Sequence, residues 1–504
     1  MTSLDLAPRA RGDDDALASP RLAGALYAAL VALAAAPAWL WPIPRANDIV
    51  NHWARLTLYG MAADDPLRAL YRVQFGLIPN LGLDALYLAL QPFASAQTVT
   101  RLALALAIAL PALGAWALHR ALFAKPSPTI WAIPFLSYNV ATTGGLLNFS
   151  IGMGLAFLAL AVIARRGERL GWREALALNL FGVALFFCHL IAWGAFALLF
   201  GLMRVACPPA RLRRGAYLVA AQLAPLALVA LRQAPPSTYS LGGTKLGILF
   251  APVASMTGSD LTALTLLVAG AALAVVLGLR PAPQARAALA GFALVTLLAP
   301  PALGAASLID ARLAVYLWYF AIATSWLDAS GAVRGFCALA SVAATAWRLH
   351  AVAPAWEAFQ ERGAQVRAGL ASLPQGARAL VVAPERCGAA DFAMFGNLTA
   401  FAVIDRRAYV NTLFAQTGIQ PSAPADPALD GGPTLPMDSR WLTEDGRASL
   451  PARLVEAPWA APYRDWRRHF THVIDAHSDC ASMLSVPGLT RVGGAAGLDV
   501  YRVD

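Results

Sequence analysis

The sequence predicts an α-helical polytopic membrane protein with about eleven transmembrane helices and a small C-terminal α/β domain. Residues 22–41 form a run of 20 residues without a charge, the length that a helix needs to cross the hydrocarbon core. Of the 504 residues, 58% are hydrophobic and 13% are charged, against roughly 25% charged in a typical soluble domain. After residue 350 the polar content rises and no spanning run follows. We therefore expect a tail (1–20), a transmembrane part (21–350) and a soluble part (351–504).

The net charge of +10 comes from Lys and Arg residues that lie mostly in short connections between apolar runs. This distribution is typical of positive cytoplasmic loops in a membrane protein, and it gives no support to nucleic-acid binding. Arg9, Arg11 and Arg21 predict a cytoplasmic N-terminus. Alternation of the spans then places the C-terminal part outside the cytoplasm.

Further uncharged runs indicate the other spans. The run 175–203 is long for one span and short for two, and arginines flank both of its ends. Both ends should therefore be cytoplasmic, and the run should turn back on itself near His189. The remaining runs are 101–119, 128–145, 146–164, 217–230, 261–279, 287–307, 314–327 and 335–347.

Residues 42–97 form an unusually large first outer loop, and loops of this size are generally functional. Within it, residues 81–93 are apolar but too short to span, and they contain Asp84. We expect an interfacial or re-entrant helix there.

A stripe of polar residues opens this loop. Asp48, His52, Arg55 and Tyr59 follow the spacing i, i+4, i+7 and i+11, which places them on one face of a helix. We expect this helix to lie at the outer interface, with Trp53 as an aromatic anchor and the charged stripe turned toward a cavity.

Polar residues from three later stretches fall on the same side of the expected topology. Asn148 follows a broken segment, His189 lies at the hairpin apex, and Asp310 and Arg312 occupy an outer turn. Taken singly, Asp310 and Arg312 also fit a loop pair, and His189 fits a hydrogen-bonded interhelical histidine. Ionisable groups near the membrane are costly, so their convergence on one face favours a shared pocket with Asp48.

Four stretches carry a resemblance. They are NDIVNHWAR (47–55), FGLIPN (75–80), GGLLNF (144–149) and CHL (188–190). With an aspartate directly after the first span, many short spans and a soluble outer part, the chain resembles the glycosyltransferase C superfamily. Within it, these stretches are similar to a group of uncharacterised bacterial membrane proteins.

The resemblance implies transfer of a sugar from a polyprenyl-phosphate donor to a glycan, lipid or protein acceptor at the outer face of the bilayer. Only Asp48 matches a family position, that of the first-loop acid, which serves as catalytic base or supports metal and acceptor. Asp48 stands alone where an acidic pair is common, so we assign no metal ligand and leave a divalent metal open.

The chemistry agrees with this assignment. The acceptor hydroxyl must lose a proton, which a carboxylate within hydrogen-bond reach accepts. The guanidinium groups of Arg55 and Arg312 suit the departing phosphate, and His52 or His189 would donate to the same oxygens or orient Asp48. The predicted catalytic residues are Asp48 and His52, and the predicted substrate-binding residues are Arg55, Tyr59, Asn148, His189, Asp310 and Arg312.

The soluble part has its own pattern. Trp356, Phe359, Gly363, Val366 and Leu370 fit one face of an amphipathic helix that ends near residue 374. Residues 379–383, 471–476 and 498–503 predict buried strands of a small α/β domain, and residues 421–437 predict a loop.

The soluble part gives little support to cofactors. His472 and His477 cluster with Asp475 and Cys480, but in strand alternation the two histidines point to opposite faces, so we predict no metal site. Nucleotide binding has no support, because no glycine-rich phosphate loop follows a strand. The tripeptide 397–399 matches a glycosylation acceptor, a pattern too common to weigh.

The five cysteines do not indicate a disulfide framework, although one bridge between Cys387 and Cys480 stays open. Two other functions stay open as well: a transporter or lipid flippase with a charged outer cavity, and a non-catalytic membrane scaffold. Broken helices favour a transporter, but the chain has no visible internal repeat.

Overall fold

The computed structural model describes residues 20–166, 171–205, 222–231, 245, 248, 250–255, 259–303, 306–384, 396–432, 436–442, 460–477, 482, 484–495 and 497–504. Their contacts divide the chain into two compact units. We call residues 1–40, 79–83 and 102–354 the helical unit, and residues 41–78, 84–101 and 355–504 the mixed unit. The predicted outer loop 42–97 therefore falls largely in the mixed unit, together with the C-terminal part.

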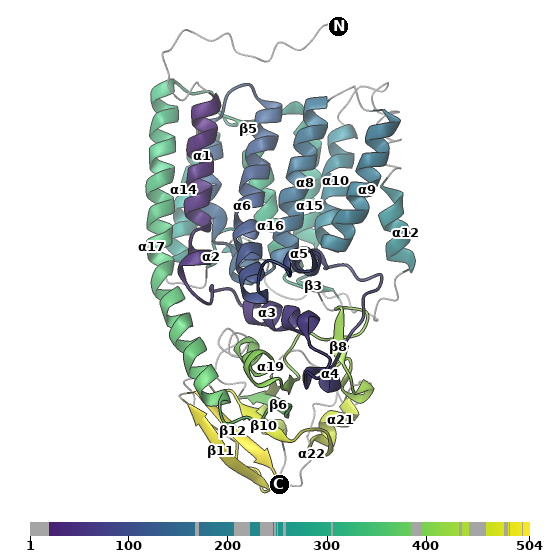
Figure 1. Cartoon of the computed structure of the whole chain (residues 1–504). Helices are drawn as coiled ribbons and strands as arrows, with labels where there is room; N and C mark the ends of the chain where they lie inside the picture. The colour runs from purple at the N-terminus through teal and green to yellow at the C-terminus, as the bar shows by residue number, and fades with distance from the viewer. Residues whose placement is uncertain are drawn as a thin grey trace. The chain divides into compact units, whose positions relative to one another are not determined.

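The helical unit consists of apolar helices that run side by side (Figure 1). Its helices are α1 (Pro20–Ala35), α2 (Pro37–Leu40), α6 (Ala96–Leu122), α7 (Val140–Thr143), α8 (Leu147–Arg166), α9 (Trp172–Cys188), α10 (Leu190–Val205), α12 (Leu223–Leu231), α14 (Asp260–Val276), α15 (Arg286–Leu298), α16 (Ile309–Ala323) and α17 (Gly331–Leu370). The first residues of α6, up to Arg101, and the last residues of α17, from Ala355, belong to the mixed unit. Short pieces between the helices are η3 (Pro128–Ala132), η4 (Pro134–Ser137), η6 (Pro283–Ala285), β2 (Arg280–Pro281), β3 (Ala302–Leu303), β4 (Ala306–Ser307) and β5 (Ser325–Trp326).

Four helices in the described part of the chain are long and apolar enough to cross a membrane: Arg21–Leu40, Ala96–Leu122, Leu147–Arg166 and Gly331–Leu370. Shorter apolar helices are Leu190–Arg204, Asp260–Val276 and Pro283–Leu298. The chain is thus a candidate membrane protein, but the prediction of about eleven spans is wrong.

The physical reason is that an uncharged run is not always a long helix. The run 128–145 forms two 3₁₀ turns, η3 and η4, and the one-turn helix α7. Pro128 and Pro134 each open a 3₁₀ turn, and Gly145 adopts a positive φ of 79° after α7. The predicted run 217–230 is described only from residue 222 onward.

The predicted turn in the run 175–203 is confirmed. Helix α9 ends at Cys188 and α10 begins at Leu190, with His189 extended between them at φ −166°. The rings of Phe181 and Phe196, which lie on opposite sides of the turn, are 5.3 Å apart. The two helices therefore fold back against each other.

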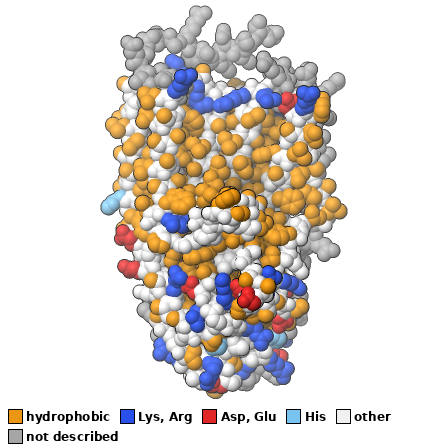
Figure 2. Space-filling model, in the orientation of Figure 1, with side chains coloured by type: hydrophobic (Ala, Val, Ile, Leu, Met, Phe, Trp, Pro, Cys, Tyr) orange, Lys and Arg blue, Asp and Glu red, His pale blue; other side chains and the backbone are white. Residues whose placement is uncertain are grey.

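Charged side chains of the helical unit gather at one end of its helices, while apolar side chains cover the rest of the visible surface (Figure 2). Contacts connect several helix termini. Strand β2, with Arg280, pairs with β5, and His119 near the end of α6 contacts the carbonyl of Ala323 at the end of α16. The gathering of charged side chains at one end of the helices is typical of a bundle that crosses a bilayer with one positive side.

The mixed unit contains a six-stranded sheet in the order β11-β12-β10-β6-β7, with β9 also paired to β6. Strands β6, β7, β9 and β10 are parallel, and β12 and β11 complete the sheet antiparallel. The strands are β6 (Arg378–Ala383), β7 (Tyr409–Val410), β9 (Met437–Asp438), β10 (His472–Asp475), β11 (Leu489–Ala495) and β12 (Leu498–Val503). The three predicted strands are confirmed as β6, β10 and β12, because buried β-branched runs are a strong local signal.

Helix α17 carries the predicted amphipathic face. Trp356, Phe359, Val366 and Leu370 are buried, as expected from their spacing. The helix is nevertheless one continuous element of 40 residues from Gly331, although Pro354 lies inside it. The composition change near residue 351 therefore does not end a helix.

Further elements of the mixed unit come from both ends of the sequence. They are α3 (Ile49–Thr57), η2 (Leu58–Gly60), α4 (Leu67–Leu70), β1 (Tyr71–Val73), α5 (Gly82–Leu90, whose first two residues belong to the helical unit), α19 (Phe401–Arg406), β8 (Ser422–Pro424), η8 (Pro427–Leu429), η9 (Ser439–Trp441), α21 (Ala460–Arg464) and α22 (Trp466–His469). Strand β1 pairs antiparallel with β8. The predicted loop 421–437 thus contains a short strand, β8, which its Pro- and Gly-rich composition did not predict.

Candidate functional site

The candidate site in the mixed unit forms where α3 meets the carboxyl end of the parallel strands. The segment after β6 supplies Asn397, and the segment after β7 supplies Phe414 and Gln420. All three contact polar residues of α3. The carboxyl ends of parallel strands are the usual place for ligand sites in α/β sheets, because the connecting loops converge there.

Asp48 directly precedes α3 and is half-buried. Its carboxylate makes no capping hydrogen bond to the helix that it precedes. Instead, its Oδ1 accepts a hydrogen bond of 3.2 Å from Nδ2 of Asn397. The helix N-terminus and the amide donor both favour the ionised form of such a carboxylate.

Asn397 is itself fixed by α3. Its Oδ1 accepts a hydrogen bond of 2.5 Å from Nδ2 of Asn51, and Asn51 Oδ1 accepts one of 3.2 Å from the backbone N–H of Phe414. The side-chain hydroxyls of Thr399 and Thr412 are 2.7 Å apart, which joins the turn of Asn397 to the segment of Phe414. Asn51, Asn397, Thr399 and Thr412 are all buried.

Arg55, one turn further along α3, is fully buried with Asp84 of α5. Arg55 Nη2 lies 3.0 Å from Asp84 Oδ2, and Arg55 Nη1 donates a hydrogen bond of 2.5 Å to Gln420 Oε1. Tyr59 donates to the other oxygen of Asp84 at 2.5 Å. Burial raises the pKa of Tyr59 far above its ordinary value, so its hydroxyl remains a donor.

These contacts bear on two predicted roles. The guanidinium of Arg55 is committed to protein partners inside the fold, which does not match direct contact with a substrate phosphate. The same holds for the hydroxyl of Tyr59. We therefore treat both as residues that position α3.

His52 and Trp53 pack against neighbours in the same unit. The His52 ring is buried and meets the Phe414 ring edge-on at 6.3 Å. Trp53 meets Phe401 of α19 edge-on at 5.8 Å. Trp53 thus has a ring partner in its own unit, and its role as an aromatic anchor stays a prediction.

In the helical unit, Asn148 orders a chain turn. Its Nδ2 donates to the side-chain and backbone oxygens of Asn80, both at 2.7 Å, and its Oδ1 accepts from the N–H of Leu83 at 2.6 Å. Asn80 adopts a positive φ of 85°, which its amide partner helps to hold. Asn148 therefore fixes the entry to α5.

The structure brings two other predicted residues of the helical unit together. Arg312 Nη1 lies 3.4 Å from His189 Nε2, and its guanidinium lies 5.8 Å from the centre of the Phe149 ring. Asp310 pairs with Lys245 at 2.9 Å. Lys245 is a cation that no sequence motif singled out.

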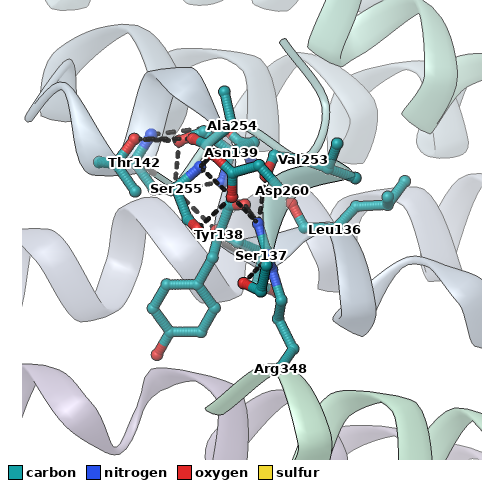
Figure 3. Close-up of polar contacts among 12 residues, drawn as sticks. Leu136, Ser137, Tyr138, Asn139, Thr142, Val253, Ala254, Ser255, Asp260 and Arg348 are labelled. Atoms are coloured by element: carbon teal, nitrogen blue, oxygen red, sulfur yellow. Dashed lines mark hydrogen bonds and ion pairs between the residues drawn. The ribbon is translucent and has the colours of Figure 1, made fainter. Parts of the chain in front are cut away.

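The helical unit also contains an ion pair with a buried arginine, Arg348 (Figure 3). Arg348 of α17 lies 3.1 Å from Asp260 of α14 and also donates to the carbonyls of Tyr138 and Val253. Asp260 accepts from Ser255 through the backbone N–H, at 3.0 and 3.1 Å, and through the hydroxyl, at 2.5 Å. The cluster ties the broken segment between α6 and α8 to two helices.

The described residues contain no group of three or more His, Cys, Asp or Glu side chains that could hold a metal ion. His477 pairs with Asp499 at 3.4 Å, and His472 contacts Thr471 at 2.9 Å. The question of a bridge between Cys387 and Cys480 lies outside the described residues.

Sequence reasoning missed the partners Asp84, Asn397 and Gln420. Asp84 carried a signal, because a charge in an apolar stretch requires a partner. Asn397 stood in a tripeptide that suggested only modification. Gln420 carried no signal, since an isolated glutamine is common in loops.

Comparisons of the chain with protein-family models, curated proteins and solved structures give no match.

Proposed function

We propose that the chain is a membrane enzyme that transfers a sugar from a polyprenyl-phosphate donor to an acceptor at the extracytoplasmic face, with Asp48 as general base. The observation that carries the proposal is the half-buried carboxylate of Asp48, held by the amide of Asn397 where α3 meets the carboxyl end of parallel strands. The candidate membrane helices supply a setting in which a lipid-linked donor is available.

Chain connectivity supports the proposed topology. Residues 41–78 and 84–101, which follow the first apolar helix, share one compact unit with residues 355–504. We propose that both stretches lie on one side of the membrane and that the two termini lie on opposite sides. The arginine-rich connections support a cytoplasmic N-terminus.

In the proposed reaction, the acceptor oxygen forms a bond to the anomeric carbon while the bond from that carbon to the phosphate oxygen breaks. The acceptor proton passes to Asp48, and the electron pair of the broken bond leaves with the polyprenyl phosphate. A single displacement of this kind inverts the anomeric centre. A positioned base contributes about 10²–10⁴-fold to the rate.

The other residues have separate roles in the proposal. Arg55, Tyr59 and Asn51 position α3, and His52 orients the acceptor side of Asp48. Arg312, which lies beside His189 in the helical unit, stays a candidate for phosphate binding from the sequence. Asn148, which fixes a chain turn, and Asp310, which neutralises Lys245, support the fold rather than contact substrate.

Purified protein in nanodiscs, supplied with a polyprenyl-phosphate sugar and short-chain alcohol acceptors, tests the proposal. We expect glycoside formation or slow donor hydrolysis, and loss of at least about a hundredfold in Asp48→Asn. Asp64→Asn, an exposed acid of the same loop, is the matched control and should keep full activity. Full activity of Asp48→Asn would contradict the role of Asp48 as base.

A transporter or lipid flippase is the second candidate. The broken segment of η3, η4 and α7 favours it, because discontinuous helices often line transport sites. Movement of the donor across a proteoliposome membrane without cleavage of the sugar-phosphate bond would support the transporter and contradict the enzyme.

A further inference from the structure

We infer that Asn397 is a positioning residue for Asp48. A series of hydrogen bonds that starts at the backbone N–H of Phe414 holds the amide nitrogen of Asn397 against the Asp48 carboxylate. This inference rests on the proposed function for its catalytic meaning. Its geometry stands on the contacts of the mixed unit alone.

The direction of these hydrogen bonds follows from the first donor, the backbone N–H of Phe414. A backbone N–H can only donate, so the N–H of Phe414 requires the oxygen of the Asn51 amide at 3.2 Å. The nitrogen of Asn51 then points away and donates to Asn397 Oδ1 at 2.5 Å. Asn397 is left with its nitrogen toward Asp48 Oδ1, at 3.2 Å. If the amide of Asn51 or Asn397 were rotated by 180°, two donors or two acceptors would face each other.

The frame around this series is rigid. Thr399 and Thr412 are fully buried and their hydroxyls are 2.7 Å apart. The backbone N–H of Ala400 bonds to the carbonyl of Asn397 at 3.2 Å, which closes the turn. Because each part of the frame is buried, the amide of Asn397 reaches Asp48 in a fixed orientation.

The consequence for Asp48 is electrostatic as well as geometric. A donor that cannot turn into an acceptor favours the ionised carboxylate, the form that accepts a proton. Asn397 thereby acts on the reaction through Asp48 without touching substrate.

The charged neighbours of Asp48 along the chain are Arg45, His52 and Arg55, the last of which is paired with Asp84. Helix α19, which packs on α3, carries Asp405 and Arg406. Asp405 accepts from Arg367 at 2.7 and 2.8 Å, and Arg406 donates to the carbonyl of Leu373. The segment 411–420 carries no ionisable side chain.

An introduced thiol tests the inference without any need for activity. In full-length protein with the five native cysteines replaced, Asp48→Cys places a thiol at the start of α3, and its rate of alkylation by iodoacetamide is followed against pH. Adding Asn397→Leu should raise the pKa of this thiol, so that the rate near neutral pH falls about tenfold, the size of one pKa unit. Equal profiles would overturn the inference.

Three further variants sharpen the result. Asn397→Asp keeps the shape of the side chain but replaces the donor by a second carboxylate, so the thiol pKa should rise further. Asn51→Leu should raise it in the same direction by less. Asn411→Ala removes another buried asparagine, which accepts from the N–H of Val381 at 2.7 Å, and should leave the profile unchanged. A shift in Asn411→Ala as large as in Asn397→Leu would overturn the inference.

The imidazole of His52 can change its charge in the same pH range, so the comparison is repeated with His52→Gln, where the shift should persist. In the transfer assay, Asn397→Leu should move the acidic limb of kcat/KM to higher pH. If the unaltered protein transfers no sugar, the proposed function fails, while the thiol measurement still decides the role of Asn397.

Discussion

Two aspartates at helix starts, Asp260 in the helical unit and Asp48 in the mixed unit, are held in different ways. Asp260 accepts from two groups of Ser255 and from the guanidinium of Arg348, whose side chain is 1% exposed. Asp48 accepts from the neutral amide of Asn397. Loss of Asp260 takes the ion-pair partner from a buried cation, whereas loss of Asp48 takes an acceptor from the neutral amide of Asn397.

The comparison separates acids that support the fold from the acid that we propose as the general base. An acid paired with a buried guanidinium contributes to the fold and is hard to reach. The amide of Asn397, by contrast, fixes one oxygen of Asp48 and favours its ionised form. By this criterion Asp84 resembles Asp260, since it pairs with fully buried Arg55.

The largest expected effect on stability belongs to Asp84. Asp84→Asn leaves the buried guanidinium of Arg55 without its carboxylate, which should cost about 3–5 kcal/mol of unfolding free energy. The unfolding midpoint in detergent measures the loss. Replacing the pair together, Arg55→Met with Asp84→Leu, should recover more than half of it. A double variant no more stable than Asp84→Asn would contradict the ion-pair explanation.

Asp260→Asn should cost less, about 2–3 kcal/mol, because the side chain of Asp260 is 20% exposed and water compensates part of the loss. Asp48→Asn is the matched variant and should change the same midpoint by less than about 1 kcal/mol. If Asp48→Asn destabilised the protein as much as Asp260→Asn, the distinction between the two acids would fail.

What the sequence could reveal follows the range of the interactions. Strands β6, β10 and β12 and the buried face of α17 were predicted because their apolar spacing is local. The turn at His189 was predicted from arginines on both flanks. The expected number of spans was too high, because absence of charge does not show where prolines and glycines interrupt a helix.

The candidate site was only partly accessible to this reasoning. The helical stripe of Asp48 and Arg55 was visible, since it depends on neighbouring residues. The contact of Asp48 with Asn397 joins residues 349 positions apart, and no local pattern encodes it. The buried role of Arg55 was not predicted either, because its partners Asp84 and Gln420 are 29 and 365 positions away.

Two glycines, one in each unit, differ in the atoms that surround them. In the helical unit, a Cβ on Gly154 would lie 2.5 Å from the backbone carbon of Leu110 and 2.7 Å from the nitrogen of Pro111. In the mixed unit, a Cβ on Gly363 would lie 2.9 Å from the flexible end of Ile43. Gly154→Ala should therefore cost about 1–3 kcal/mol, and Gly363→Ala much less. Equal losses in the detergent midpoint would contradict this difference.

The smallest expected effect comes from Asp475 at the end of β10, an acid held by a hydroxyl. Asp475 is fully buried, and Ser482 donates to its Oδ2 at 2.5 Å. Burial raises the pKa of Asp475, so the fold favours its protonated form. Stability from this group is therefore greatest below the ordinary carboxyl pKa and declines as pH rises through the raised value.

Asp475→Asn imitates the protonated form and can still accept the hydrogen bond from Ser482. Its unfolding midpoint should exceed that of the unaltered protein at about pH 8, and the difference should shrink toward about pH 4, where the native carboxyl takes up its proton. Asp48→Asn, whose parent carboxylate is half-buried and held by an amide, should show no such gain at pH 8. A neutral-pH gain confined to Asp475→Asn would establish that desolvation penalises one acid, while the amide of Asn397 lets the other remain charged without loss.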